Sequence, residues 1–166
     1  MKQTTFPFTW EIFSLNSKVL LLLFSALMIT QCSGGRPPSL GVTDGKLSPC
    51  PDSPNCVSSQ STDKKHHVEP LRYQDTLAEA RDRLVSILHS MGRTTVVTVQ
   101  ENYIHAEFTS RLFRFVDDVE FCFDDDHKTI HLRSASRTGY SDLGVNRKRI
   151  ERIRQRFVTS RRQEDN

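Results

Sequence analysis

The chain has 166 residues, a formal net charge of +3 and 36% hydrophobic residues, so it has the apolar content of a folded domain. About 120 residues remain once the N-terminal segment is set aside, which is enough for one domain. Basic side chains crowd the C-terminus and acidic side chains crowd the middle, so opposite charges can pair within the fold. Without a nucleic-acid motif, this distribution disfavours a nucleic-acid partner.

The N-terminal segment has the layout of a secretory signal peptide. The apolar run VLLLLFSALMI at 19–29 is too short to cross a bilayer, which takes roughly 20 apolar residues. The residues before Cys32 resemble the lipobox of bacterial lipoproteins, although Gln31 stands where a small residue is usual. We therefore expect a lipoprotein signal peptide over 1–31 and lipidation of Cys32, palmitate included. The alternative is a short uncleaved anchor or simple secretion.

The segment after Cys32 predicts a flexible tether over 32–46, because SGGRPPSLG is rich in Gly, Pro and Ser. Ser33 favours sorting to the outer membrane, by resemblance to enterobacterial lipoproteins. We expect one domain over 47–158 and a basic, polar tail over 159–166. The lipid anchor would hold that domain in the bacterial cell envelope, at the outer membrane and facing the periplasm.

Cysteine and histidine residues near the start of the domain predict a disulfide and no metal site. Cys50 and Cys56 flank two prolines that bend the chain, so a bridge is sterically reasonable in an oxidising periplasm. The pair lacks the spacing and further ligands of a zinc site, and His66 and His67 are merely adjacent. Cys122 lies in an apolar strand and is expected to be a small buried side chain. No metal and no cofactor is predicted.

The periodicity of apolar residues predicts a helix over 76–91 and then strands. Thr76 and Glu79 form a capping box, and Gly92 offers a C-cap. From residue 94 the period changes to two. The expected strands are 94–99, 103–109, 112–123 and 129–136.

A final helix follows, with Asp142 as its predicted N-cap. Its inward stripe is Leu143, Asn146, Ile150, Ile153 and Phe157. The order helix, four strands, helix predicts an α+β domain, in which a four-stranded antiparallel meander is covered on one face by two helices.

Asp117 is the unusual residue of the third strand. Alternation puts it on one face with Phe113, Phe115, Val119, Phe121 and Phe123. A carboxylate there must be paired, or its pKa must rise by desolvation. A bulge that turns Asp117 to solvent and an arginine partner are two explanations. A catalytic or ligand-binding carboxylate is the third.

Polar residues gather where the last strand turns into the final helix, and backbone N–H groups at a helix N-terminus favour an anion. The candidate ligand-binding residues are Arg133, Ser134, Arg137, Tyr140, Asn146, Arg147, Asp117, Asp118 and Glu120. The competing interpretation, which we prefer, is that Arg133 or Arg137 clamps the carboxylates in bidentate pairs and so latches the strands to the helix.

Three blocks together resemble the uncharacterised domain family numbered fourteen-ninety-nine: CPDSPNCVSSQ at 50–60, FRFVDDVEF at 113–121 and RSASRTGYSDLGVNRKRIERIR at 133–154. The resemblance covers 47 to about 158 and implies that the blocks form one domain. Bacterial members look like small envelope proteins or lipoproteins. The family has no established activity, so the resemblance implies no catalytic residues.

The sequence favours a non-enzymatic envelope module that binds a partner protein of the envelope or a small anionic ligand. It has no GxSxG elbow, no Gly-rich phosphate loop and no HExxH motif. One alternative is a hydrolase-like enzyme that uses Asp117, Asp118 or Glu120 as general acid or base. Another is a purely structural protein whose charges pair with one another.

Overall fold

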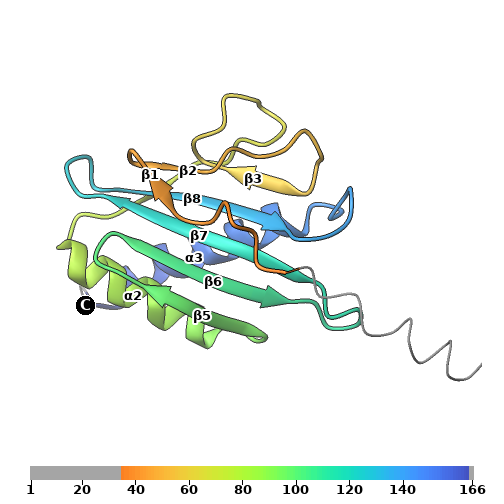
Figure 1. Ribbon diagram of the computed structural model, residues 1–166. Helices are drawn as coiled ribbons and strands as arrows, with labels where there is room; N and C mark the ends of the chain where they lie inside the picture. The colour runs from red at the N-terminus through yellow and green to blue at the C-terminus, as the bar shows by residue number, and fades with distance from the viewer. Residues whose placement is uncertain (1–34, 165–166) are drawn as a thin grey trace, which may run out of the picture. The chain divides into compact units, whose positions relative to one another are not determined.

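The computed structural model describes residues 35–164, so the signal peptide predicted over 1–31 and Cys32 lie outside the described residues. Figure 1 shows the arrangement of the elements. In chain order they are β1 (Val42–Thr43), β2 (Lys46–Leu47), β3 (Cys56–Ser58), β4 (Leu71–Arg72), α2 (Leu77–Ser90), β5 (Thr94–Val99), β6 (Tyr103–Thr109), β7 (Val116–Asp124), β8 (Thr129–Ser136) and α3 (Val145–Glu164).

Helix α2 begins with the predicted capping box. The Thr76 hydroxyl accepts from the Glu79 amide, and the Glu79 carboxylate accepts from the Thr76 amide at 2.9 Å. The prediction of Gly92 as C-cap is wrong, because the capping residue is Met91 in an extended conformation. The left-handed residue that follows is Arg93, with φ 61°. The helix thus ends at Ser90, and the extended Met91 places its side chain in the core.

Strands β5 to β8 form the predicted antiparallel meander, which confirms the α+β fold class. The sheet has six strands in the order β3-β8-β7-β6-β5, with β4 also paired to β8. The sequence does not predict β3 and β4, since strands of two or three residues are too short to show a period of two.

The start of β7 departs from the prediction. The expected strand begins at residue 112, but 111–115 form an exposed connection in which Arg114 has φ 57°. Phe113 and Phe115 stack on each other with ring centroids 5.5 Å apart and do not share the buried face of Asp117. A left-handed residue interrupts the extended backbone, so the alternation is correct only from Asp117 onwards.

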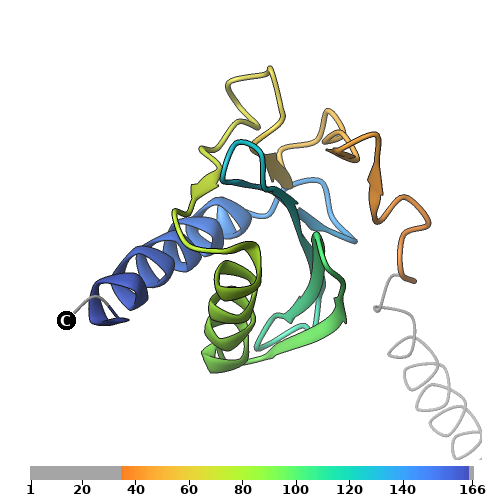
Figure 2. The same cartoon turned by 90° about the vertical axis from the view of Figure 1, so that its left-hand side faces the viewer.

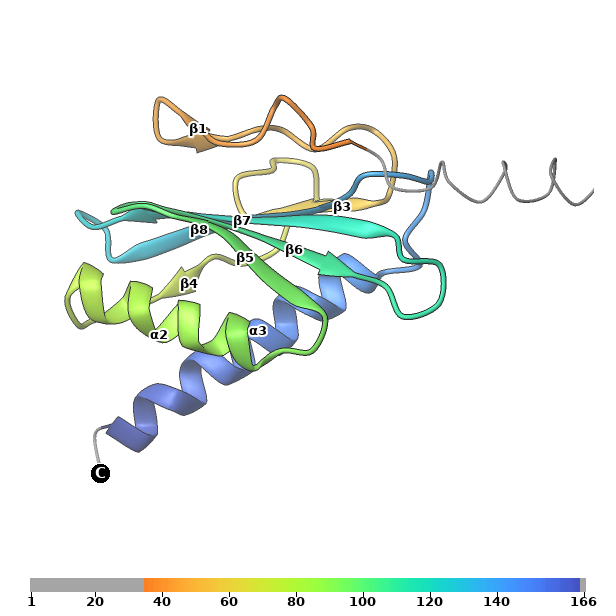
Figure 3. The same ribbon diagram turned by 60° about the horizontal axis from the view of Figure 1, so that its bottom comes forward.

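The two faces of the sheet are covered by different material. Helices α2 and α3 pack on one face, where Leu88, Phe121 and Ile153 belong to the main core (Figures 2 and 3). The N-terminal segment runs over the other face, and the amide of Gly41 donates to Glu120 at 2.8 Å. Where it is described, the segment predicted as a tether over 32–46 therefore contacts the sheet.

Helix α3 begins later and ends later than predicted. The Asp142 carboxylate accepts hydrogen bonds from the amides of Gly144 (2.9 Å) and Asn146 (2.7 Å), as a cap does. Leu143 precedes the helix and is 86% exposed, so its predicted place on the buried stripe is wrong. The rest of the stripe is buried. The helix continues to Glu164, through most of the segment predicted as a tail.

Among the described residues, neither helix combines the length and the apolar character that crossing a membrane requires.

Candidate functional site

Strand β7 distributes three buried carboxylates over the two faces of the sheet. Asp117 points toward the helices, whereas Asp118 and Glu120 point toward the N-terminal segment. Each carboxylate bonds an arginine. The pairs are Asp117 with Arg149, Asp118 with Arg137 and Glu120 with Arg133. The preferred interpretation of the sequence is confirmed in part: Arg133 and Arg137 do pair with β7 carboxylates, but the pair that joins β7 to α3 is Asp117 with Arg149.

The Asp118–Arg137 pair is bidentate. Nε of Arg137 donates to Oδ2 at 2.8 Å and Nη2 donates to Oδ1 at 2.7 Å. Nη2 also donates to Glu107 at 2.6 Å, and Nε2 of His105 lies 2.8 Å from Asp118. Burial opposes ionisation of Asp118, but its hydrogen bonds to Arg137 and His105 lower its pKa below the ordinary value.

The same cluster has the composition of a metal site. One ligand atom from each of His105, Glu107 and Asp118 lies within 4.8 Å of the others. The guanidinium of Arg137, however, donates to both carboxylates and supplies the positive charge that a metal ion would bring. The geometry therefore favours a structural ion pair at this place.

Glu120 is fully buried and anchors the N-terminal segment to the sheet. Its carboxylate accepts from the Tyr103 hydroxyl at 2.9 Å, from the Gly41 amide at 2.8 Å and from Arg133 at 3.1 Å. Burial, and then the charge of Glu120, raise the pKa of the Tyr103 phenol, so it stays a donor. This carboxylate is occupied on both of its oxygens.

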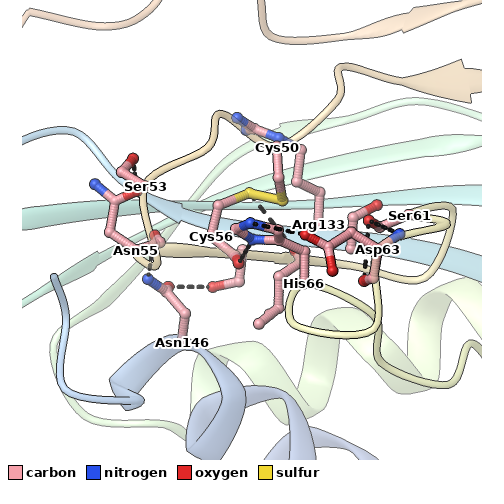
Figure 4. Close-up of a disulfide and its surroundings, with 12 residues drawn as sticks. Cys50, Ser53, Asn55, Cys56, Ser61, Asp63, His66, Arg133 and Asn146 are labelled. Carbon is pink, nitrogen blue, oxygen red and sulfur yellow. Dashed lines mark hydrogen bonds and ion pairs between the residues drawn. A yellow bond between two sulfur atoms is a disulfide. The ribbon is translucent and has the colours of Figure 1, made fainter. Parts of the chain in front are cut away.

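Asp117 belongs to a network on the helix-covered face. Arg149 bonds Asp117 with one nitrogen and Ser134 at 3.0 Å with the other. Asn146 accepts from the Ser134 hydroxyl at 2.5 Å. Its side chain also donates to the backbone of Asn55 at 3.0 Å (Figure 4). The network therefore ties β7, β8 and α3 to the loop that leads into β3.

That loop is closed by the predicted disulfide between Cys50 and Cys56 (Figure 4). The side chain of Asn55 donates to the carbonyl of Gly139 at 2.6 Å, which joins the loop to the turn after β8. His66 lies with Nδ1 2.8 Å from the carbonyl oxygen of Cys56. The free thiol of Cys122 is buried, and burial raises its pKa.

The predicted ligand-binding residues do not converge on one site. Arg133 and Arg137 lie on the face of the N-terminal segment, while Ser134 and Asn146 lie under α3. Arg147 donates to the backbone of residues 65 and 67. The side chain of Tyr140 is 76% exposed. The N-terminus of α3, where an anion was expected, is capped by the chain's own carboxylate.

A separate cleft of about 320 Å³ lies beside the first turns of α3, against the ends of β6 and α2. Its cationic lining residues are Arg93, Lys148, Arg149, Arg152 and Arg156. Lys148 and Arg152 are exposed, and no carboxylate of the described residues pairs with either. The cleft therefore concentrates positive charge that the fold does not neutralise.

Local sequence does not predict this cleft, although it contains part of the signal. Lys148, Arg152 and Arg156 recur every four residues, which puts them on one face of a helix. The sequence around Arg93 does not predict that this residue lines the cleft, because its place there depends on how the α2–β5 connection meets α3.

The fold and these groups define a small α+β domain whose buried carboxylates are structural and whose unpaired cations gather beside α3. The chain belongs to the family described as "Protein of unknown function (DUF1499)", which matches residues 46–157. The resemblance of the three sequence blocks is thereby confirmed. None of the curated proteins matches this chain.

Proposed function

We propose that this protein is a lipid-anchored binding module of the bacterial envelope, whose cleft beside α3 takes a small anionic ligand. The observation that carries the proposal is the set of unpaired cations in the cleft. Arg93, Lys148 and Arg152 project where phosphate or carboxylate oxygens can be bound by charge-assisted hydrogen bonds. The site borders the turn between β8 and α3, because Val145 at the start of α3 lines it.

The location in the envelope is supported by the sequence and by the disulfide. The apolar run at 19–29 and the lipobox-like residues before Cys32 support export and lipidation, and Ser33 supports the outer membrane. The Cys50–Cys56 bridge fits an oxidising compartment such as the periplasm.

The rival function, hydrolysis by the β7 carboxylates, receives less support. A general acid at neutral pH needs a raised pKa, whereas the hydrogen bonds to Arg137 and His105 lower that of Asp118 despite its burial. Asp117 and Glu120 are also held by arginines and buried. Such groups are arranged to hold strands together rather than to exchange protons with a substrate.

The test is the affinity of the full chain, in detergent micelles, for inorganic phosphate, measured by calorimetric titration. Lys148→Gln combined with Arg152→Gln should weaken binding at least about tenfold, since hydrogen bonds to charged groups contribute about 1.5–3 kcal/mol each. The matched control is Lys64→Gln with Lys65→Gln, which removes equal charge from an exposed loop. Equal affinity in both double variants would contradict the proposal.

A further inference from the structure

Exposed apolar side chains gather at one end of the described domain. Eight large hydrophobic residues are exposed among the described residues, and six of them lie at this end, on the β6–β7 connection or around the start of α3. The six are Leu112, Phe113, Phe115, Tyr140, Leu143 and Val145. Figure 1 shows that both connections leave the sheet at the same end. We call this set of residues, 111–115 with 140–145, the apolar tip.

The chemistry of the tip alternates charge and apolar surface. Residues 111–115 read RLFRF, with two arginines and no acid. In the second connection, the carboxylate of Asp142 is used to cap α3. Arginine beside exposed aromatic and aliphatic side chains suits the interface of an anionic bilayer, where guanidinium groups meet phosphates and apolar groups enter the acyl boundary.

The backbone of the tip holds these side chains outward at positions where glycine would be less strained. Arg114 has φ 57° and Leu143 has φ 54°, both in the left-handed region. Leu143 is nonetheless almost fully exposed, so no packing inside the domain accounts for a leucine there. Strain without an internal contact points to a contact outside the domain.

The proposed lipid anchor lies close to this end in the sequence. Arg36 stands four positions after Cys32 and donates to Glu107 on β6 at 3.0 Å. Four residues span at most roughly 14 Å when fully extended. The described chain starts toward the end of the sheet that carries the tip (Figures 1 and 3). An anchor at Cys32 would therefore hold this end, rather than the 99–103 hairpin, near the lipid surface.

We infer that the apolar tip docks on an anionic lipid bilayer, with Leu112, Phe113 and Leu143 in the interface and Arg111 and Arg114 at the headgroup phosphates. The inference rests on the proposed lipid anchor for its orientation. It does not rest on the cleft, whose cations lie on α3 and at the α2–β5 connection. The docked domain would expose the cleft beside the membrane surface.

The test is the depth of a single tryptophan in vesicles that contain the full chain. In a Trp10→Phe background, Phe113→Trp is compared with Val99→Trp, which is also exposed but belongs to the β5–β6 hairpin at the opposite end. Vesicles of phosphatidylglycerol and phosphatidylcholine carry brominated acyl chains, which quench tryptophan on contact. We expect quenching to be at least threefold greater at position 113 than at position 99.

Equal quenching at the two positions would overturn the inference. So would shielding of position 113 that depends on protein concentration and not on brominated lipid, because a second copy of the chain would then cover the tip. Arg111→Gln with Arg114→Gln should reduce quenching at position 113. Unchanged quenching would contradict the inferred contact of these two arginines with the headgroup phosphates. Failure of the anchor proposal is detected separately, because palmitate labelling would then persist in Cys32→Ala. Failure of the cleft proposal is detected by the phosphate titration.

Discussion

Arg137 joins neighbouring strands of the sheet through buried ion pairs. It bridges two carboxylates from neighbouring strands, Asp118 on β7 and Glu107 on β6, and its side chain is 8% exposed. Removing one partner of a buried pair leaves charge without compensation, which costs far more than the pair itself contributes. We therefore expect this residue to govern stability rather than ligand binding.

The first prediction concerns Arg137→Gln. At pH 7 it should lower the free energy of unfolding by about 3–5 kcal/mol, because the buried charge of Asp118 would lose its bidentate cation and Glu107 would keep only Arg36. Urea denaturation measures this. The control is Arg81→Gln, whose partner Asp82 is largely exposed and which should change stability by less than about 1 kcal/mol. Similar losses in the two variants would contradict the structural role.

The loss of stability in Arg137→Gln should be larger at pH 7 than at acidic pH. The pKa of Asp118 is lowered in the folded state, so its contribution to stability is complete above the ordinary aspartate pKa of about 3.9 and is lost as the pH falls through the folded-state pKa. Without Arg137 the largest cause of that lowering is lost, and only His105 remains to favour the charged form. The difference in the free energy of unfolding between wild type and Arg137→Gln should therefore narrow from pH 7 to pH 3. A difference that stays constant over this range would contradict the pairing of Asp118 with Arg137.

At the scale of elements, the disulfide loop fixes the edge of the sheet. Cys56 opens β3, the short strand that pairs with β8 opposite Ala135. The loop also reaches the turn at Gly139 and the buried Asn146 through Asn55. Opening the loop should therefore loosen β3 and the β8–α3 turn together.

Cys50→Ser with Cys56→Ser tests the loop. For so short a loop, chain entropy gives a loss of roughly 2–3 kcal/mol in the free energy of unfolding. Dithiothreitol should produce the same loss in wild type and no further loss in the double variant, both followed by thermal melting. A double variant as stable as the oxidised wild type would exclude a structural role for the bridge.

The elements also mark how far sequence reasoning reaches. The capping box at Thr76 and the period-two strands predict α2 and the meander because each signal is local. The periodic pattern places Leu143 and Phe113 on buried faces wrongly, because left-handed residues at Leu143 and Arg114 break the local period. β3 and β4 exist only through pairing with β8, which no short segment reveals.

The sequence predicts that Asp117 is paired, but it does not predict which residue is its partner. A carboxylate on an apolar face requires a partner, so a pair for Asp117 could be expected. Its partner is Arg149 rather than Arg133 or Arg137, because those two serve the opposite face of the sheet. The identity of the partner follows from where α3 crosses the sheet, and local sequence does not contain that.

At the scale of the whole molecule, the groups that stabilise the fold lie in different places from the groups proposed to bind a ligand or lipid. Its buried charges hold the N-terminal segment on one face and α3 on the other, through Glu120 and Asp117. The unpaired cations of the cleft and the apolar tip lie at the margin where β6 and β8 end and α3 begins. In this account the carboxylates stabilise the fold, and this margin meets the envelope.

Amide hydrogen exchange of the full chain tests that division most directly. Exchange is compared between vesicles of phosphatidylcholine alone and vesicles that also contain phosphatidylglycerol. We predict that the anionic lipid slows exchange at 111–115 and 140–152, while the strand segment 116–120 exchanges as before. Slower exchange at 36–47 and 116–120, with no change at 111–115 and 140–152, would contradict this prediction. It would indicate that the lipid contacts the sheet face covered by the N-terminal segment.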